Sequence, residues 1–385
     1  MKRKCKGVDI TDLDLIIEAL YSCFKPVKKR LRFDTIEMFA EKLNVSKRKA
    51  RAILKDRSEG YNEAICLIAE DLQRDLREHT LKLTPIRQCV RIEPSSRKER
   101  VISVLGIRQL MLDHIAVAGL AELTKRVGQY QVSSIKGKGA SYGFQAIRRW
   151  LGKKSCKYAV KLDIKNFYGS VGKDVLIGWL NRHVKNRELL WLVGSLINTV
   201  QEGIAIGSYL SQTLANVYLS DLYHLVTERC RSKRGINQVK HALFYMDDML
   251  LLGTNKRHLL RAANTLIRYA KNVLGLTVKP NWQVYKVTHE HPVDMMGYRF
   301  SHNRITIRKR VFKTLRRTLI HIKCRSNLTL HLARRMASYY GYLVNTDSKG
   351  FLKHQKACQI LDKAFQYIKY EESCQILRRA QNAVA

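Results

Sequence analysis

The stretch HALFYMDDMLLLG, His241 to Gly253, decides the predicted fold. Apolar residues flank Asp247 and Asp248 on both sides, which predicts two strands joined by a tight turn that carries both carboxylates. Adjacent carboxylates in apolar surroundings repel each other and resist desolvation, so a cation must compensate them unless the turn is simply solvated. Mg²⁺ prefers carboxylate oxygens together with substrate phosphates and fits such a position.

A third carboxylate precedes this stretch. Asp163 follows the predicted strand Tyr158 to Leu162, in a chain where acidic residues are sparse. Two divalent ions held by carboxylates can stabilise the attacking and leaving oxygens of an in-line phosphoryl displacement. Asp163, Asp247 and Asp248 are therefore the candidate catalytic residues.

The charge of the whole chain points to a polyanionic partner. Its 385 residues include 71 Lys plus Arg against 32 Asp plus Glu, a formal net charge of +39. This excess argues against an ordinary neutral metabolic enzyme and for nucleic acid, because neutralised phosphates release counterions. The sequence has no run of 18 apolar residues, and its 9 cysteines form no metal-spaced cluster. We expect a cytoplasmic protein with no membrane contact and reduced cysteines.

Apolar residues at helical spacing predict an N-terminal helical extension over residues 1–77. Within it, Thr35 to Leu54 outlines a helix–turn–helix whose second helix is opened by Ser46 as N-cap. That helix is basic and carries Lys47, Arg48, Lys49 and Arg51. It is a solvated face, an RNA contact or a duplex reader. The last alternative describes a helix-turn-helix nucleic-acid-binding protein without polymerase activity.

Strands and helices alternate in the rest of the chain, which predicts an α+β fold. CVRIEP and RVISV predict a basic hairpin, and the sequence from Lys309 onward is helical and basic. The helices predicted between these regions are Gln109–Lys125, Tyr142–Leu151, Lys173–Arg182, Leu210–Val226 and Arg257–Val273.

These motifs, in this order, resemble reverse transcriptases over roughly residues 85 to 350. Tyr245 to Asp248 is similar to the YMDD box of the palm, and Asp163 with Tyr168 is similar to motif A, whose aromatic residue excludes a ribose 2′-hydroxyl. Leu274–Pro280 resembles motif D and Met295–Phe300 the primer grip. RIEPSSRKERVIS resembles the fingers hairpin, which implies triphosphate contacts from Arg97, Lys98 and Arg100.

Motif B narrows the resemblance. Ile206–Gln212 reads IGSYLSQ, a form that resembles the reverse transcriptases of diversity-generating retroelements and the unclassified bacterial enzymes of phage defence. Gly207 would give backbone freedom beside the nascent base pair, and Ser211 with Gln212 would open the helix that lies against the template.

The resemblance implies a right-hand polymerase: fingers at 78–157, palm at 158–303 and a basic thumb at 304–385. It implies two Mg²⁺ ions, with Mn²⁺ as an alternative, bound by Asp163, Asp247, Asp248 and the Ile164 carbonyl. The motif D lysine is Lys279 or Lys286, and we favour Lys279. Gly207, Gln212, Tyr168 and Lys279 would then contact the nucleotide.

Basic residues outside the palm are predicted to contact nucleic acid. Lys136 and Lys138 lie in a glycine-rich segment, IKGKGASYG. The thumb residues predicted to follow the duplex backbone are Lys309, Arg310, Lys313, Arg316, Arg317, Arg334 and Arg335. The fingers helix departs from the DRxxxH form of these families, since RQLMLDH has Leu110 where the arginine is expected. Arg108 could replace it, or the hairpin alone could bind the triphosphate.

The implied partners are a template or noncoding RNA, the DNA product, dNTPs, and an accessory protein or a second copy of the chain. Two biological roles stay open: antiphage defence with a dedicated noncoding RNA, which we favour, and mutagenic copying in a diversity-generating retroelement.

Overall fold

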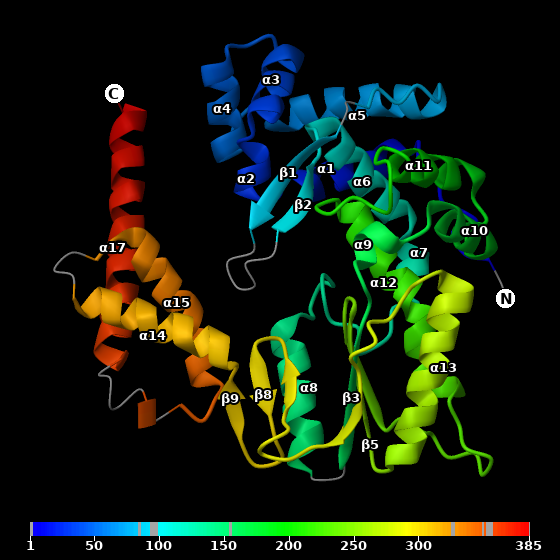
Figure 1. Ribbon diagram of the computed structural model, residues 1–385. Coiled ribbons are helices and arrows are strands. Elements are labelled where there is room, and N and C mark those ends of the chain that lie inside the picture. The colour runs from blue at the N-terminus through cyan, green and yellow to red at the C-terminus, as the bar shows by residue number, and fades with distance from the viewer. Residues whose placement is uncertain are drawn as a thin grey trace. The chain divides into compact units, whose positions relative to one another are not determined.

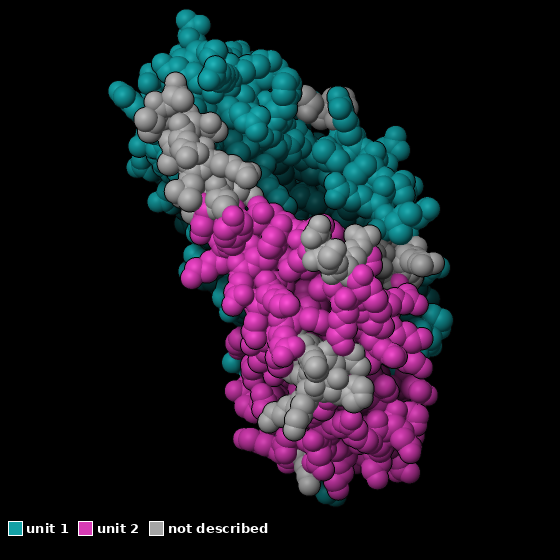
Figure 2. All heavy atoms as spheres, turned by 90° about the vertical axis from the view of Figure 1, so that its left-hand side faces the viewer, with its two compact units in different colours: residues 1–139, 161–250, 260–282 teal, residues 140–160, 251–259, 283–385 magenta. Residues whose placement is uncertain are grey.

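The computed structural model describes residues 3–83, 86–92, 99–153, 156–324, 328–348, 350–351 and 357–384 (Figure 1). The chain divides into two compact units, coloured separately in Figure 2. Unit 1 comprises residues 1–139, 161–250 and 260–282, and unit 2 comprises 140–160, 251–259 and 283–385.

Unit 1 begins with helices, as the spacing of apolar residues predicts. These helices are α1 Leu13–Phe24, α2 Val27–Arg30, α3 Phe33–Lys42, α4 Lys47–Asp56 and α5 Tyr61–Arg77. The Ser46 hydroxyl accepts a hydrogen bond from Lys49 N and caps α4, which confirms the predicted N-cap. Asn44, with φ +48°, makes the turn between α3 and α4.

An antiparallel hairpin follows, with β1 at Arg87–Ile92 and β2 at Glu99–Val104. The single helix predicted over Gln109–Lys125 is wrong in one respect, because the structure has two helices, α6 Ile107–Gly119 and α7 Ala121–Thr124. The α6 helix ends at Gly119, where a side chain would meet Leu189 at 2.7 Å. The helical geometry is lost at Leu120, with φ −83° and ψ 7°, directly after this close contact with α11.

A four-stranded sheet carries the central part of the fold, with strand order β4-β5-β3-β6. Its strands are β3 Tyr158–Asp163, β4 His241–Tyr245, β5 Asp248–Gly253 and β6 Val284–Lys286. The helices around these strands in the sequence are α8 Ala140–Gly152, α9 Phe167–Ser170, α10 Lys173–His183, α11 Arg187–Ile197, α12 Tyr209–His224 and α13 Lys256–Leu274. A π-helical turn, Leu225–Arg229, extends α12.

Unit 2 holds a three-stranded meander and the C-terminal helices. The meander consists of β7 Val293–Met295, β8 Tyr298–Phe300 and β9 Ile305–Ile307. The helices are α14 Lys309–Lys323, α15 Leu330–Val344 and α17 Ala357–Val384, and Leu315, Met336 and Leu361 lie in their shared core. The mixed elements confirm the predicted α+β class. Among the described residues, no helix is long and apolar enough to cross a membrane.

Candidate active site

The tip of the β4–β5 hairpin carries two adjacent carboxylates. Leu243, Phe244, Met249 and Leu250 are at most 1% exposed, so the strands are anchored in the core on both sides of the turn. Met246 takes the left-handed conformation, with φ +54°, in the two-residue connection to β5. The apolar strands therefore hold Asp247 and Asp248 at the edge of the core, as the sequence predicts.

Asp163 is the last residue of β3, and its negative charge affects the pKa of Asp247. Burial, together with the charges of Asp248 and Asp163, raises the pKa of Asp247 to about 6, although Lys279 acts in the opposite direction. These three carboxylates belong to unit 1, as does Lys279. Asp163 and Asp248 thus lie close enough to Asp247 to affect its pKa.

Lys279 neutralises Asp163. Its Nζ lies 2.6 Å from Asp163 Oδ1, and its backbone N donates to Asp163 O at 2.8 Å. Lys165 N donates to Thr277 O at 2.8 Å, so the chain after β3 pairs with the segment that contains Lys279. The other motif D candidate, Lys286, lies in β6 opposite Tyr158. Of these two lysines, Lys279 is the one whose ammonium contacts a carboxylate of the site.

Lys161 is a second counter-charge that the sequence analysis missed. Its Nζ lies 3.0 Å from Asp248 Oδ1, with both side chains about one-third exposed. Residues two apart on a strand share a face, so Lys161 and Asp163 project from the same side of β3. The alternation in KLD was the signal that could have found it.

The donor set suits a hard divalent ion. Asp163, Asp247 and Asp248 offer carboxylate oxygens, and Asp163 Oδ1 is buried without a hydrogen bond of good geometry despite its ion pair. The hydrogen bonds of the Ile164–Val278 bridge use Asp163 O and Lys165 N, not the Ile164 carbonyl. In the part of the chain that the structure describes, no three acidic, His or Cys side chains converge in a metal-binding geometry, and lysines lie against two of the carboxylates.

Tyr168 lies on α9 near the carboxylates. Burial raises the pKa of Tyr168 to about 12, and the charge of Asp247 contributes in the same direction. The Tyr168 carbonyl accepts a hydrogen bond from Ile204 N at 2.9 Å. Gly203 makes this approach feasible: its φ is +65°, and a Cβ there would lie 2.1 Å from Tyr168 O. The sequence analysis missed Gly203, because its partner lies 35 residues away in the printed sequence.

The helix that contains the end of motif B starts earlier than predicted. The α12 helix begins at Tyr209, and Ser208 caps it by accepting from Ser211 N at 3.0 Å, so Ser211 and Gln212 do not open the helix. Both serines offer an N-cap oxygen, and tertiary packing selects Ser208. Gly207 has φ +109°, which confirms its need for backbone freedom, and a Cβ there would lie 3.0 Å from Ser103 O. Gln212 is half-buried in the first turns of α12.

A buried carboxylate holds the start of α12. Asp113, on α6, is 1% exposed and accepts from Ser208 Oγ at 2.6 Å and Tyr209 N at 3.1 Å. Burial raises the pKa of Asp113 to about 6, although these hydrogen bonds oppose the shift. The neighbouring His114 stacks on Tyr209, with ring centroids 4.4 Å apart, and its Nε2 lies 3.1 Å from Lys29 Nζ. Through these contacts, α6 holds the first residues of α12 in place.

Residues 92–300 match the family described as reverse transcriptase (RNA-dependent DNA polymerase), more than half of the chain. The chain belongs to this family. No curated protein matches the sequence. Among 309 matching chains of solved structures is telomerase from Candida albicans in complex with a fragment of telomeric RNA. It is 12% identical, with a TM-score of 0.39, and the match covers 78% of this chain and 65% of that chain.

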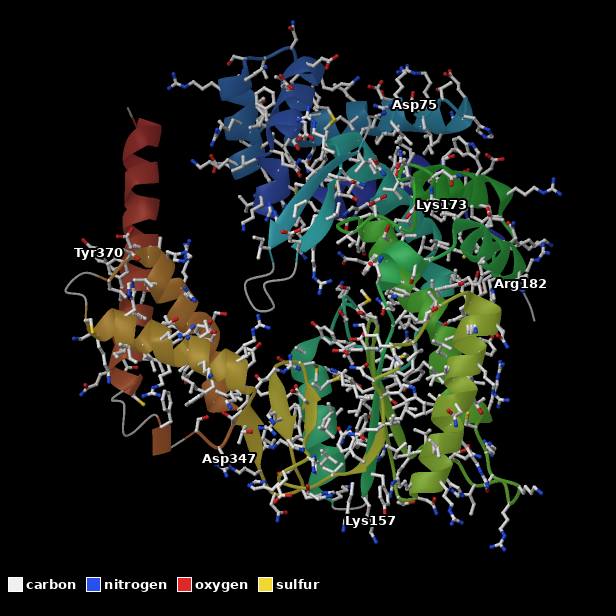
Figure 3. The ribbon with its side chains drawn as sticks, viewed as in Figure 1. Asp75, Lys157, Lys173, Arg182, Asp347 and Tyr370 are labelled. Atoms are coloured by element: carbon white, nitrogen blue, oxygen red, sulfur yellow. The ribbon has the colours of Figure 1, made fainter. Side chains whose placement is uncertain are left out.

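Arg108, one of the two alternatives left open for the missing arginine of the fingers, is engaged in an ion pair. Arg108 forms an ion pair with Asp75 of α5, labelled in Figure 3, which is 4% exposed. Its guanidinium therefore balances a buried carboxylate. The fingers hairpin pairs Arg100 with Arg91, and Arg100 is exposed. Arg97 and Lys98 lie outside the described residues.

The basic residues predicted to bind nucleic acid differ in their surroundings. Lys138 donates to Gly128 O at 3.0 Å, and burial lowers its pKa, whereas Lys136 is exposed. The α14 helix buries Leu315 and Leu319. Its exposed face carries Lys309, Arg310, Lys313, Arg316 and Arg317, and Arg334 and Arg335 on α15 are exposed as well. In this reverse transcriptase, α14 and α15 therefore expose these basic side chains to solvent.

Proposed function

We propose that the chain is an RNA-directed DNA polymerase, which copies an RNA template into DNA from dNTPs. One observation carries the proposal: Asp163, at the end of β3, lies close enough to the tip of the β4–β5 hairpin for its charge to act on Asp247 together with that of Asp248. With burial as the largest cause, the pKa of Asp247 is raised to about 6. The three carboxylates lie inside the segment that matches the reverse transcriptase family.

In this proposal, Asp163, Asp247, Asp248 and the Ile164 carbonyl hold two Mg²⁺ ions or, alternatively, Mn²⁺. Such ions supply charge neutralisation at the α-phosphate and lower the pKa of the attacking 3′-hydroxyl. The carboxylates hold the reacting groups in line, because positioning and charge neutralisation provide most of the catalysis in phosphoryl transfer.

The remaining residues select and orient the nucleotide. The Tyr168 ring blocks the position of a ribose 2′-hydroxyl, and Gly207 lets the backbone approach the nascent base pair. Lys279, whose ammonium lies 2.6 Å from Asp163, is placed to bind the pyrophosphate oxygens once it leaves that carboxylate. Arg97, Lys98, Arg100 and Gln212 complete the proposed nucleotide contacts.

Primer extension tests the activity. The purified chain, an RNA template, a DNA primer, dNTPs and Mg²⁺ should yield full-length DNA, and omission of the divalent ion should stop synthesis. A chain that extends no primer on RNA under these conditions, although folded by circular dichroism, would falsify the proposed function.

For the biological role, we favour antiphage defence with a dedicated noncoding RNA over mutagenic copying in a diversity-generating retroelement. The IGSYLSQ form of motif B supports both roles, while the five N-terminal helices and the net charge of +39 support a stably held RNA. Sequencing of RNA that copurifies with the chain separates them. One dominant structured RNA supports defence, whereas a template repeat with a copurifying small basic accessory protein supports the retroelement. The same purification shows whether the chain forms a homo-oligomer.

A further inference from the structure

Unit 2 contains a cavity of about 610 Å³ that no proposed catalytic residue lines. Three segments form its walls: the C-terminal half of α8, the turn between β8 and β9, and the C-terminal end of α15. Its volume lies in the range of sites that enclose a ligand of several groups. A smaller cavity of about 190 Å³ shares Ser301 and Arg304 with it.

The lining is cationic. Arg148, Arg149 and Arg304 line the larger cavity together with His302, and Asp347 is the one acidic residue among the described residues that line it. The smaller cavity adds Arg299 and His289 and no acidic residue. Arg148 and Arg304 are exposed, and arginine binds phosphate oxygens with two parallel hydrogen bonds.

Asp347, labelled in Figure 3, offsets one of these positive charges and also holds the wall together. Its Oδ2 accepts from Ile305 N at 2.7 Å, while its own N donates to Ile305 O at 2.9 Å. His302 Nδ1 lies 2.9 Å from Leu151 O, which ties the turn to α8. The Ser301 N and Oγ both donate to Arg304 O at 2.9 Å. Hydrogen bonds between the lining segments thus hold the backbone that carries these cationic side chains.

The polar groups of the lining favour a sugar–phosphate backbone over a base. Gln145, Asn303 and Asn345 offer amides that can donate to or accept from a ribose hydroxyl. No Phe, Tyr or Trp stands among the lining residues that the structure describes, and the one aromatic ring there, His302, is tied to Leu151 O through its Nδ1. Base recognition on single strands usually requires an aromatic platform. Amides that can pair with a 2′-hydroxyl favour RNA over DNA.

No residue of Met295–Phe300, the segment that resembles the primer grip, lines the larger cavity, although Arg299 lines the smaller one. Met296 and Gly297 form the turn between β7 and β8, whereas residues 301–304 form the turn between β8 and β9. In an antiparallel meander, consecutive turns lie at opposite ends of the shared strand, which spans about 10 Å for three residues. A primer strand at the first turn therefore leaves the second turn open to another ligand.

We propose that this cavity binds the sugar–phosphate backbone of a folded RNA, with Arg148 and Arg304 as phosphate ligands and Asn303 and Asn345 as ribose contacts. The inference rests on the proposed function only in that the enzyme uses an RNA partner. The site anchors that RNA without reading its sequence.

Fluorescence anisotropy with a hairpin RNA and the DNA hairpin of the same sequence tests this proposal, with the full chain and no dNTPs. The double variant Arg148→Gln/Arg304→Gln should bind the RNA at least about tenfold more weakly, since it loses two charge-assisted contacts. The slope of log K against log salt should fall by about 2. Asn303→Ala/Asn345→Ala should reduce the preference for RNA over DNA.

Arg261→Gln/Arg268→Gln is the matched control, because it removes the same charge from exposed positions on α13 that line neither cavity. Equal weakening by the control and the cavity variant overturns the site, as does unchanged RNA affinity in a cavity variant that melts like the wild type. Equal losses for the RNA and DNA hairpins overturn the choice of RNA. Failure of the unchanged chain to synthesise DNA would overturn the proposed function alone, because binding is measured without synthesis.

Discussion

Lys279 and Lys161 each contact one carboxylate of the candidate site, and this explains how three acids can fold into one edge of a core. Without a counter-charge, neighbouring carboxylates would oppose folding until a divalent ion arrives. The raised pKa is that of Asp247, whereas the two ammonium groups lie against Asp248 and Asp163. The lysines therefore compensate part of the negative charge, and the remaining cost of ionisation appears as the raised pKa of Asp247.

Asp247→Asn should abolish DNA synthesis and leave folding and RNA binding intact. The substitution removes a carboxylate whose ionisation burial disfavours, so thermal stability at neutral pH should stay the same or rise slightly. Primer extension and a melting curve measure the two effects. Asp174→Asn, at an exposed carboxylate in the first turn of α10, is the matched control and should extend normally. Extension by Asp247→Asn at the wild-type rate would remove the residue from catalysis.

Tyr168→Val should relax the discrimination between dNTPs and rNTPs, because the ring is proposed to occupy the space of a 2′-hydroxyl. The measurement is the ratio of kcat/KM for the two nucleotides. Tyr168→Phe keeps the ring and should keep the selectivity. If both variants discriminate like the wild type, then Tyr168 is not the gate.

Gly203→Ala tests the close approach to Tyr168. Gly235 has a similar left-handed φ of +75° and no atom within 4 Å of an added Cβ, whereas the Gly203 Cβ would meet Tyr168 O at 2.1 Å. Gly235→Ala should lower the free energy of unfolding by about 1 kcal/mol from backbone strain alone. Gly203→Ala should cost roughly 2 kcal/mol more, because the contact must be relieved. Urea unfolding of both variants measures the difference, and equal costs would contradict the packing.

At the scale of elements, the junction of α6 with α12 combines two titrating groups with opposite effects on stability. Burial raises the pKa of Asp113 to about 6, so between about pH 4 and 6 the folded state binds more protons and stability falls as pH rises. Burial, aided by the charge of Lys29, lowers the pKa of His114 to about 3, so stability rises between about pH 3 and 6.5. The two slopes largely cancel.

Asp113→Asn should therefore make the free energy of unfolding rise more steeply between pH 4 and 6, by up to about 1.4 kcal/mol per pH unit. His114→Gln should do the opposite and leave a falling curve. Urea unfolding at several pH values gives both slopes, independent of any constant offset from lost packing. Parallel curves for the wild type and both variants would show that neither group titrates in this window.

Local patterns predicted the elements, and distant partners account for most of what they missed. Apolar runs on both sides of Asp247 and Asp248 were enough to predict the hairpin, and Ser46 was enough to predict the start of α4. The pairing of Arg108 with Asp75 links residues far apart in sequence, and no local spacing contains it. The choice of Ser208 over Ser211 as N-cap depends on Asp113. A sequence shows which residues can cap a helix. Which of two candidate serines becomes the N-cap depends on a tertiary contact, here with Asp113.

At the scale of the whole molecule, the charge of +39 is distributed over faces with different freedom to bind RNA. On α4, Lys47, Arg48, Lys49 and Arg51 are all exposed, but Lys47 pairs with Glu37 at 2.5 Å and lies over the Phe33 ring. The triple variant of these three residues to Gln should weaken binding of the copurifying RNA and reduce the salt slope by about 3. Lys47→Gln, the control, should change the slope little. Filter binding over a salt series decides, and indistinguishable slopes would assign α4 a structural role only.

The first residues of α6 and of α12 each donate hydrogen bonds to a carboxylate on a helix that precedes them in the chain. The Asp34 carboxylate, in the first turn of α3, accepts from Ile107 N at 2.9 Å at the start of α6. Asp113, on α6, does the same for Ser208 and Tyr209 at the start of α12. During synthesis from the N-terminus, each acceptor leaves the ribosome before the helix that needs it. We infer that the nascent chain assembles in this order, so that motif B is shaped by helices that were completed earlier.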